Sequence, residues 1–319
     1  MSFKSFSITI ICGIFLLFGV IWGVTWLMPL DTYFSHSEMW QQKQYIESHP
    51  NDRIIFLGDS RMKVGMDPAI FGSDASNIAL WGTSTIELYY TLKRYIENND
   101  IRPEVAVISF SSEHIRSIGS FYPQTLEAHT FDEYLDEING TFIELDGKDM
   151  SREIMAHRYR LPGSYMKPVI DGLMHSRKDA NSEKIESLNN RKGFAPIDGH
   201  LSDDTKIPDD AKLEHFLPNP SNVYYLNKAL DLCKKYGIKV YYIQFPARQI
   251  VVDRMNNSGY MRQYQDFLLD LKNNHPEAVI EYDIPVWDIQ WFADDSHLNE
   301  AGAEIFSQVI KRKYFFEER

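Results

Sequence analysis

The sequence has very little cysteine. Of its 319 residues only two are cysteines, Cys12 in an apolar N-terminal run and Cys233 in a segment with helical periodicity. Two cysteines placed in this way do not make a disulfide framework, and their spacing does not suit a zinc site. We therefore predict neither an internal disulfide nor a metal centre.

An excess of positive charge is also lacking. The chain has 33 Lys and Arg against 45 Asp and Glu, which gives a net charge of −12 at pH 7. An acidic surface repels phosphate, so nucleic acid is not an expected partner. No Gly-x-Gly-x-x-Gly or phosphate-loop pattern occurs either, and we predict no nucleotide or other cofactor.

Charge is absent altogether from one stretch, the 21 residues from Ile8 to Met28. A helix of that length spans roughly 30 Å, the thickness of the hydrocarbon core of a membrane. Trp22 and Trp26 lie near its outer end, as in an interfacial aromatic belt. A cleaved signal peptide is the alternative, but its apolar core is about 7–15 residues long and ends in small residues. We favour an uncleaved anchor.

The charges that flank this run predict its orientation. Lys4 precedes it, whereas Asp31 and Glu38 follow it, so the N-terminus is expected in the cytoplasm. The predicted organisation is a cytoplasmic tail (residues 1–7), a single transmembrane helix (8–28), a stalk (29–52) and a domain from residue 53 to 319. The protein would then sit in the cytoplasmic (inner) membrane, with its C-terminal domain facing the periplasm or the cell exterior.

The rest of the chain alternates short apolar runs with helical patterns. With 44% hydrophobic residues it can form a sizeable core. We expect strands at 53–57, 77–80, 105–110, 238–245 and 278–282, and helices at 85–98, 221–236, 260–273 and 300–313. Such alternation predicts an α/β fold, a flavodoxin-like three-layer sandwich with a parallel sheet. Residues from 112 to about 220 break the rhythm; we expect an irregular insertion that covers or shapes a site, with only short helices such as 131–138.

Two polar motifs should meet at the edge of this sheet. Gly58-Asp59-Ser60-Arg61 follows the first strand, and Asp294-Asp295-Ser296-His297 precedes the last helix. The carboxyl ends of parallel strands are where ligands bind. A serine hydroxyl is a weak nucleophile until a histidine takes its proton, and a carboxylate can orient that histidine. The motifs therefore predict Ser60 as nucleophile, His297 as base and Asp294, in preference to Asp295, as the orienting acid. The alternative is that they only cap helices and form loops.

The motifs resemble those of the SGNH hydrolases, also called GDSL esterases. Residues 56–61 look like the nucleophile block of that family, and 294–299 with Gly302 look like its Asp-x-x-His block. Residues 77–84 match the second block. The resemblance implies a Ser-His-Asp triad and an oxyanion hole formed by the backbone N–H groups of Ser60 and Gly82. It covers roughly residues 53–113 and 221–313.

The third block of the family, Gly-x-Asn-Asp, is missing. After the third strand the chain has Ser109-Phe-Ser-Ser-Glu-His114 instead, where Ser111 or Ser112 could replace the missing oxyanion donor. Asp59 and Arg61 are further candidates for substrate contact, although a solvated salt bridge or a helix-start charge is the more ordinary role. His114, His157, His200 and His215 have no metal-ligand spacing, and we expect surface or loop histidines.

A membrane anchor joined to such a domain resembles proteins that O-acylate cell-surface polymers. The resemblance implies an esterase or O-acyltransferase that acts on acyl esters of a polysaccharide, with an acylated glycan or acyl donor as substrate and a membrane-bound O-acyltransferase as partner. The missing third block supports an alternative, a catalytically degenerate domain that binds glycan or scaffolds the membrane partner.

Overall fold

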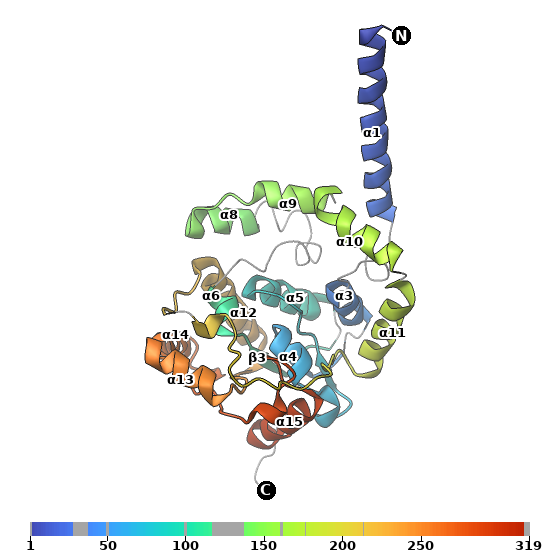
Figure 1. Cartoon of the computed structure of the whole chain (residues 1–319). Helices are drawn as coiled ribbons and strands as arrows, with labels where there is room; N and C mark the ends of the chain where they lie inside the picture. The colour runs from blue at the N-terminus through green and yellow to red at the C-terminus, as the bar shows by residue number, and fades with distance from the viewer. Residues whose placement is uncertain are drawn as a thin grey trace. The chain divides into compact units, whose positions relative to one another are not determined.

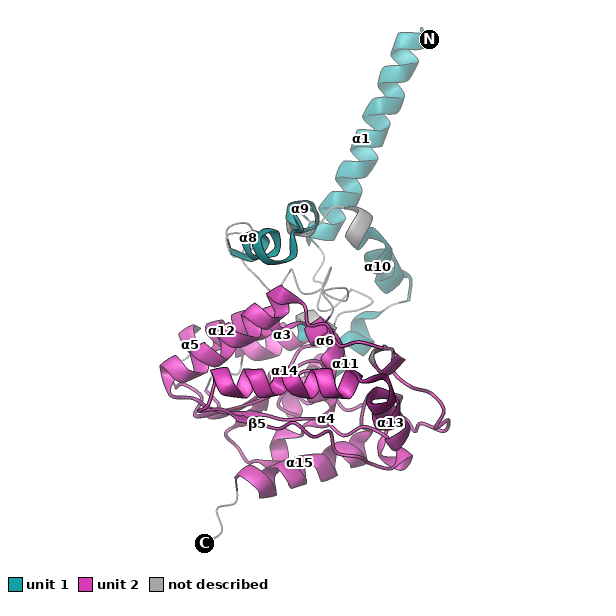
Figure 2. Ribbon diagram, turned by 90° about the vertical axis from the view of Figure 1, so that its left-hand side faces the viewer, with its two compact units in different colours: residues 1–41, 122–184 teal, residues 42–121, 185–319 magenta. Residues whose placement is uncertain are grey.

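The computed structural model describes residues 2–27, 38–48, 51–98, 101–116, 137–159, 162–175, 177–212 and 214–315 (Figure 1). The chain forms two compact units, coloured separately in Figure 2. Unit 1 comprises residues 1–41 and 122–184, and unit 2 comprises residues 42–121 and 185–319. The chain passes from one unit to the other within helices α3 (Glu38–Ser48) and α11 (Arg177–Asn190).

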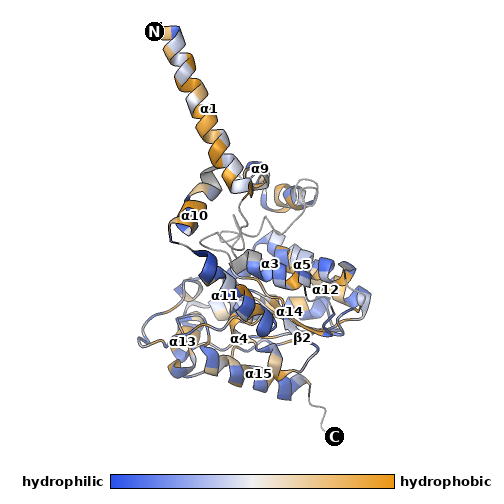
Figure 3. Ribbon diagram, turned by 90° about the vertical axis from the view of Figure 1, so that its right-hand side faces the viewer, coloured by the Kyte–Doolittle hydropathy of each residue, from blue (hydrophilic) through white to orange (hydrophobic). Residues whose placement is uncertain are grey.

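Unit 1 is helical where it is described. It contains α1 (Phe3–Leu27), the short turns α8 (Asn139–Thr141) and η4 (Phe142–Asp146), α9 (Ser151–Arg158) and α10 (Pro162–Met174). Helix α1 is long and apolar enough to cross a membrane (Figure 3). Its side chains are almost all exposed. This agrees with the predicted N-terminal helix up to Leu27. Met28 and residues 29–37, 49 and 50 of the predicted stalk lie outside the described residues.

Unit 2 contains a sheet of five parallel strands in the order β2-β1-β3-β4-β5. The strands are β1 (Ile54–Gly58), β2 (Ala75–Asn77), β3 (Val105–Ser109), β4 (Lys239–Tyr242) and β5 (Val279–Ile280). The order follows the doubly wound pattern of flavodoxin-like folds. The predicted α/β class with a parallel sheet is therefore confirmed.

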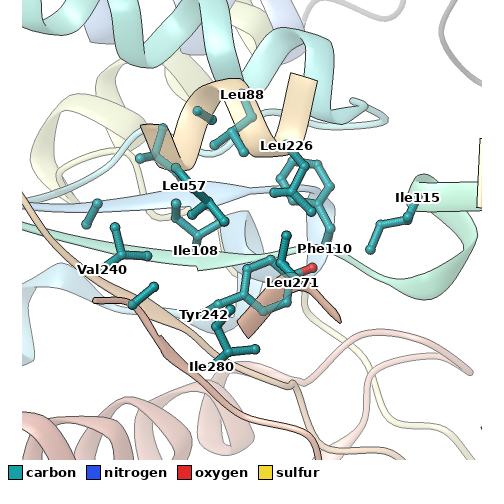
Figure 4. Packing of buried hydrophobic residues seen from close by; sticks show 14 of the residues in the cluster. Leu57, Leu88, Ile108, Phe110, Ile115, Leu226, Val240, Tyr242, Leu271 and Ile280 are labelled. Carbon is teal, nitrogen blue, oxygen red and sulfur yellow. The ribbon is translucent and has the colours of Figure 1, made fainter. Parts of the chain in front are cut away.

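Successive residues of a strand point to opposite faces of the sheet, and apolar side chains lie on both faces here. Helices therefore cover both faces. Leu57 and Ile108 face the core formed with α5 (Thr85–Asn98), α12 (Pro220–Tyr236) and α14 (Tyr260–Asn274), as Figure 4 shows. Phe56 and Val107 face the other core, formed with α4 (Ser60–Gly65) and α15 (Glu300–Tyr314). The remaining elements of unit 2 are η1 (Pro68–Ile70), α6 (Ser112–Arg116), η5 (Asp210–Lys212), α13 (Gln249–Ser258) and η6 (Ile289–Trp291).

Residues 112–220 are more regular than their composition suggests. We expected irregular chain with short helices, whereas α9, α10 and α11 have 8, 13 and 14 residues. The prediction was wrong because the glycines and prolines of this segment lie mostly at helix ends and between helices; Pro162, for instance, is the first residue of α10. The helix expected at 131–138 lies almost wholly outside the described residues.

One glycine fixes how β1 meets its neighbour. Gly58 has φ of +155°, and a Cβ at this position would lie 2.0 Å from the backbone oxygen of Ser109 on β3. A backbone oxygen held in a sheet cannot give way at small cost. The end of β1, which leads directly into Asp59 and Ser60, can therefore approach β3 only as glycine.

We expect Gly58→Ala to lower the free energy of unfolding by about 2–5 kcal/mol, from left-handed strain together with overpacking. The matched control is Gly237→Ala, which has φ of +70° but open space around the added carbon. That variant should lose only about 1–2 kcal/mol. Urea unfolding in detergent measures both variants, and equal losses would contradict the assigned close approach.

Candidate active site

Ser60 is the first residue of α4, directly after the turn that ends β1. Asp59 is the N-cap residue of α4, and its Oδ1 accepts a hydrogen bond of 2.9 Å from the backbone N–H of Arg61. Ser60 is 8% exposed. The strand-to-helix turn thus holds a hydroxyl at the carboxyl end of an interior strand of the sheet, the edge where parallel sheets bind ligands.

A tight loop before α15 carries Asp294 and His297. Its base is closed by an antiparallel bridge between Phe292 and Leu298. Asp294 Oδ1 accepts hydrogen bonds of 2.8 Å from the backbone N–H groups of both Ser296 and His297. The loop therefore fixes the carboxylate beside the imidazole through its own backbone.

The structure brings Ser60, His297 and Asp294 together. Ser60 Oγ lies 2.8 Å from His297 Nε2, and His297 Nδ1 lies 3.0 and 2.9 Å from the two carboxylate oxygens of Asp294. Partial burial raises the pKa of Asp294, but the hydrogen bond and charge of His297 and two backbone N–H groups outweigh it, leaving a pKa of about 2. An ionised carboxylate only accepts, so Nδ1 carries a proton. Whenever Nε2 carries none, it can accept the hydrogen bond of the Ser60 hydroxyl.

The neighbouring carboxylate has another partner. Asp295 Oδ1 accepts a hydrogen bond of 3.0 Å from the Ser296 hydroxyl. Of the two aspartates that the sequence offered, Asp294 is the one whose contacts suit an orienting role. Trp81, from the loop after β2, stacks on the His297 ring at 5.4 Å between centroids and 18° between planes, which limits how far the ring can turn.

The two backbone N–H groups predicted to form an oxyanion hole belong to Ser60 and Gly82. Ser60 lies in the first turn of α4, where N–H groups have no partner within the helix. Gly82 follows Trp81 and has φ of +63°. Within the described residues, the N–H of Gly82 donates to no protein acceptor. Ser60 itself contacts His297, and so does Trp81, the residue before Gly82.

The segment at the position of the missing third block, residues 109–114, donates hydrogen bonds to Asp59. Asp59 Oδ2 accepts hydrogen bonds of 2.7 Å from the Ser111 backbone N–H and of 2.7 Å from His114 Nδ1. Asp59 is 0% exposed, so the possibility that it contacts substrate is wrong. His114 belongs to α6 and its side chain is 15% exposed, so its expected place among surface or loop histidines is also wrong.

Asp59 and His114 form an ion pair. Burial raises the pKa of Asp59, yet the hydrogen bond and charge of His114, with help from Arg61 and the Ser111 N–H, hold that pKa well below its usual range. Burial likewise lowers the pKa of His114, but the hydrogen bond and charge of Asp59 raise it above the ordinary value. The spacing of 55 residues between the two hid this pair from sequence reasoning.

Other predicted residues line a small cavity beside the site. Arg61, Ser111, Ser112 and Asp295 contribute to its wall, and its volume is about 30 Å³. That volume has room for about two or three waters, since each needs about 10–15 Å³. The cavity can therefore take a small group but not a sugar ring. Among the described residues, no group of three or more His, Cys, Asp or Glu side chains could hold a metal ion.

The stabilisation from Asp59 and that from His114 change in opposite directions with pH. His114 has a raised pKa, so its contribution to stability is complete below about pH 6.5 and is lost as pH rises through the raised value. Asp59 has a lowered pKa, so its contribution is present above about pH 4 and is lost as pH falls through the lowered value. The pair should be strongest between these limits.

We expect His114→Asn, which can keep a hydrogen bond to Asp59 but not the charge, to cost about 3 kcal/mol near pH 5 and less near pH 9. Urea unfolding at the two pH values measures the difference. The control is His200→Asn, at an exposed position, which should change stability little at either pH. A cost for His114→Asn that is the same at both pH values would show that charge does not stabilise this contact.

Comparisons with known proteins identify no family for this chain. No family model, no curated protein and no solved structure matches it. Function must therefore be inferred from the contacts of Ser60, His297 and their neighbours, together with the motifs in the sequence.

Proposed function

We propose that the protein is a membrane-anchored serine esterase or O-acyltransferase of the SGNH-like type, acting outside the cytoplasm on acyl esters of a cell-surface polysaccharide. The observation that carries the proposal is the hydrogen-bonded series from Ser60 Oγ through His297 to Asp294. A hydroxyl, a neutral imidazole and a carboxylate in this order are what an activated serine requires.

In the proposed reaction Ser60 Oγ attacks the ester carbonyl while His297 Nε2 accepts its proton. The backbone N–H groups of Ser60 and Gly82 stabilise the oxyanion, and Asp294 stabilises the imidazolium that forms. His297 then returns the proton to the leaving alkoxide, and an acyl-serine remains. Attack by water on the acyl-serine releases a free acid, whereas attack by a sugar hydroxyl transfers the acyl group to the glycan.

A second cleft supports a sugar polymer as substrate. Trp287 and Trp291 line an open depression of about 320 Å³ together with Val286, Asp288, Gln249 and Ile305. Indole rings pack against the C–H faces of a sugar ring, and a carboxylate and an amide bond its hydroxyls. Trp291 comes three residues before Asp294, so the cleft flanks the loop that carries His297.

Helix α1 supports the proposed location. From Ile8 to Leu27 it contains no charged residue, and it carries Trp22 and Trp26 near its C-terminal end. We propose that it anchors the chain in the cytoplasmic membrane, with the rest in the periplasm or outside the cell. A membrane-bound O-acyltransferase is the partner that we propose there.

A second candidate function is a non-catalytic glycan-binding or scaffolding domain. It is favoured by the third-block segment, whose Ser111 N–H and His114 side chain are both engaged by Asp59. With these groups engaged, this segment supplies neither of them as a third oxyanion donor.

One labelling experiment separates the two functions. The purified chain should react with a fluorophosphonate probe and hydrolyse 4-nitrophenyl acetate, and Ser60→Ala should abolish both because the probe bonds to the activated oxygen. Asp294→Asn should lower hydrolysis on the order of 10³–10⁴-fold, since the imidazole loses its orienting partner.

The matched controls are Ser296→Ala and Asp295→Asn, which alter the neighbouring hydroxyl and carboxylate in the same loop. Both should keep labelling and at least a third of the hydrolysis. A wild-type chain as unreactive as Ser60→Ala would instead support the binding domain. If Asp295→Asn had the larger effect, Asp294 would not be the orienting acid.

Sugar binding in the Trp287–Trp291 cleft can be tested separately. Trp291→Ala should raise KM about tenfold for the best substrate in a panel of acetylated xylan, alginate and pectin, because one stacked ring is worth about 1.4 kcal/mol. Hydrolysis of 4-nitrophenyl acetate, which is too small to bridge to the cleft, should change less than twofold. Val309→Ala, an exposed change on α15, is the control. An equal loss on both substrates would exclude a sugar-binding role.

A further inference from the structure

Helix α10 has two apolar stripes, only one of which is covered. Tyr165, Val169 and Gly172 are buried and recur at helical spacing. A second set at the same spacing is exposed: Met166, Ile170, Leu173 and Met174. At about 100° per residue the second stripe lies beside the first, and Lys167 and Asp171 lie on the remaining face. Among the described residues, this 13-residue helix thus leaves four large apolar side chains between 38% and 75% exposed.

The start of α10 is attached to the C-terminal end of α1. The indole N–H groups of Trp22 and Trp26 donate hydrogen bonds of 2.7 and 3.2 Å to the backbone oxygen of Tyr159, three residues before α10 begins. Helix α10 also packs directly against α1. Both helices belong to unit 1, and the ribbons of both carry orange segments, which mark hydrophobic residues, in Figure 3.

These contacts fix the depth at which α10 begins if α1 spans a membrane. Tryptophans at the end of a transmembrane helix sit at the level of the lipid headgroups. A helix tied to the same two tryptophans starts at that level. Its exposed apolar stripe then meets the boundary between headgroups and acyl chains, and the face with Lys167 and Asp171 meets water, which is how interfacial helices lie.

We propose that α10 is an interfacial helix that lies on the lipid surface with Met166, Ile170, Leu173 and Met174 inserted in it. The inference rests on the membrane anchoring proposed above, but not on the esterase activity. The occupant is lipid because the stripe lies on a helix attached to α1, whose exposed residues from Ile8 to Leu27 carry no charge. A stripe inserted in lipid would keep unit 1 from rotating freely about a single membrane helix.

Depth-dependent fluorescence quenching tests this with the full chain in phosphatidylcholine–phosphatidylglycerol vesicles. In a Cys12→Ser/Cys233→Ser background, Ile170→Cys carries an environment-sensitive nitrobenzoxadiazole probe. The matched control, Lys167→Cys, places the same probe on the polar face of the same helix. A third protein, Cys233→Ser alone, carries the probe on native Cys12 and reports on α1.

We expect the probe at position 170 to be quenched at least threefold more strongly by shallow doxyl-labelled lipid than the probe at 167, and to be protected at least threefold from iodide. Equal iodide quenching at the two positions would mean that the stripe faces water and would overturn the proposal. Protection from both iodide and doxyl lipid at 170 would mean that protein covers the stripe, which also overturns it.

The probe on Cys12 separates this failure from that of the anchor. Strong quenching there by deep doxyl lipid, with a water-exposed position 170, refutes the interfacial helix alone. Absence of deep quenching at Cys12 refutes the anchor and the interfacial helix together. Fluorophosphonate labelling of Ser60 in the same vesicles reports on the esterase proposal independently of both.

Discussion

The buried carboxylate of Asp59 is the contact on which the rest of the site depends. Its two oxygens hold the N-terminus of α4 through Arg61 N–H, the chain after β3 through Ser111 N–H, and α6 through His114. Ser60 follows it directly, so the position of the hydroxyl is set by three attachments to the edge of the sheet. A buried charge that lost its partner would cost about 3–5 kcal/mol, which makes this arrangement hard to vary.

Two histidine–aspartate pairs therefore lie near Ser60, and their aspartates differ in exposure to water. Asp59 is shut off from water and its pair with His114 is held as ions, a state suited to fixing a loop. The side chain of Asp294 is 47% exposed, and His297 reaches Ser60 through Nε2. A proton can be taken and returned most easily where the imidazole is not already committed to a buried ion pair.

Local signals explain which features the sequence could predict. The strands and α5, α12, α14 and α15 were predictable because each has its own apolar period, and Gly237 marks the end of α12 with φ of +70°. Ser60 and His297 were predictable because each stands beside a strand or helix end. The His114–Asp59 pair and the Trp287–Trp291 cleft were not, since they depend on which loops the folded sheet brings together. The exposed stripe of α10 was not predictable because the glycines and prolines of its segment are typical of irregular chain.

The alignment of Ser60 also bears on the choice between an enzyme and a binding domain. A hydrogen bond between partly exposed side chains contributes only about 0.5–1.5 kcal/mol to folding. The Ser60–His297 contact joins residues 237 positions apart at such a site, whereas the cores on both faces of the sheet already hold α4 and α15. The contact between the imidazole and this hydroxyl therefore adds little to the stability of the fold. Proton transfer from serine to histidine requires that contact, and for that reason we place the enzyme first and the binding domain second.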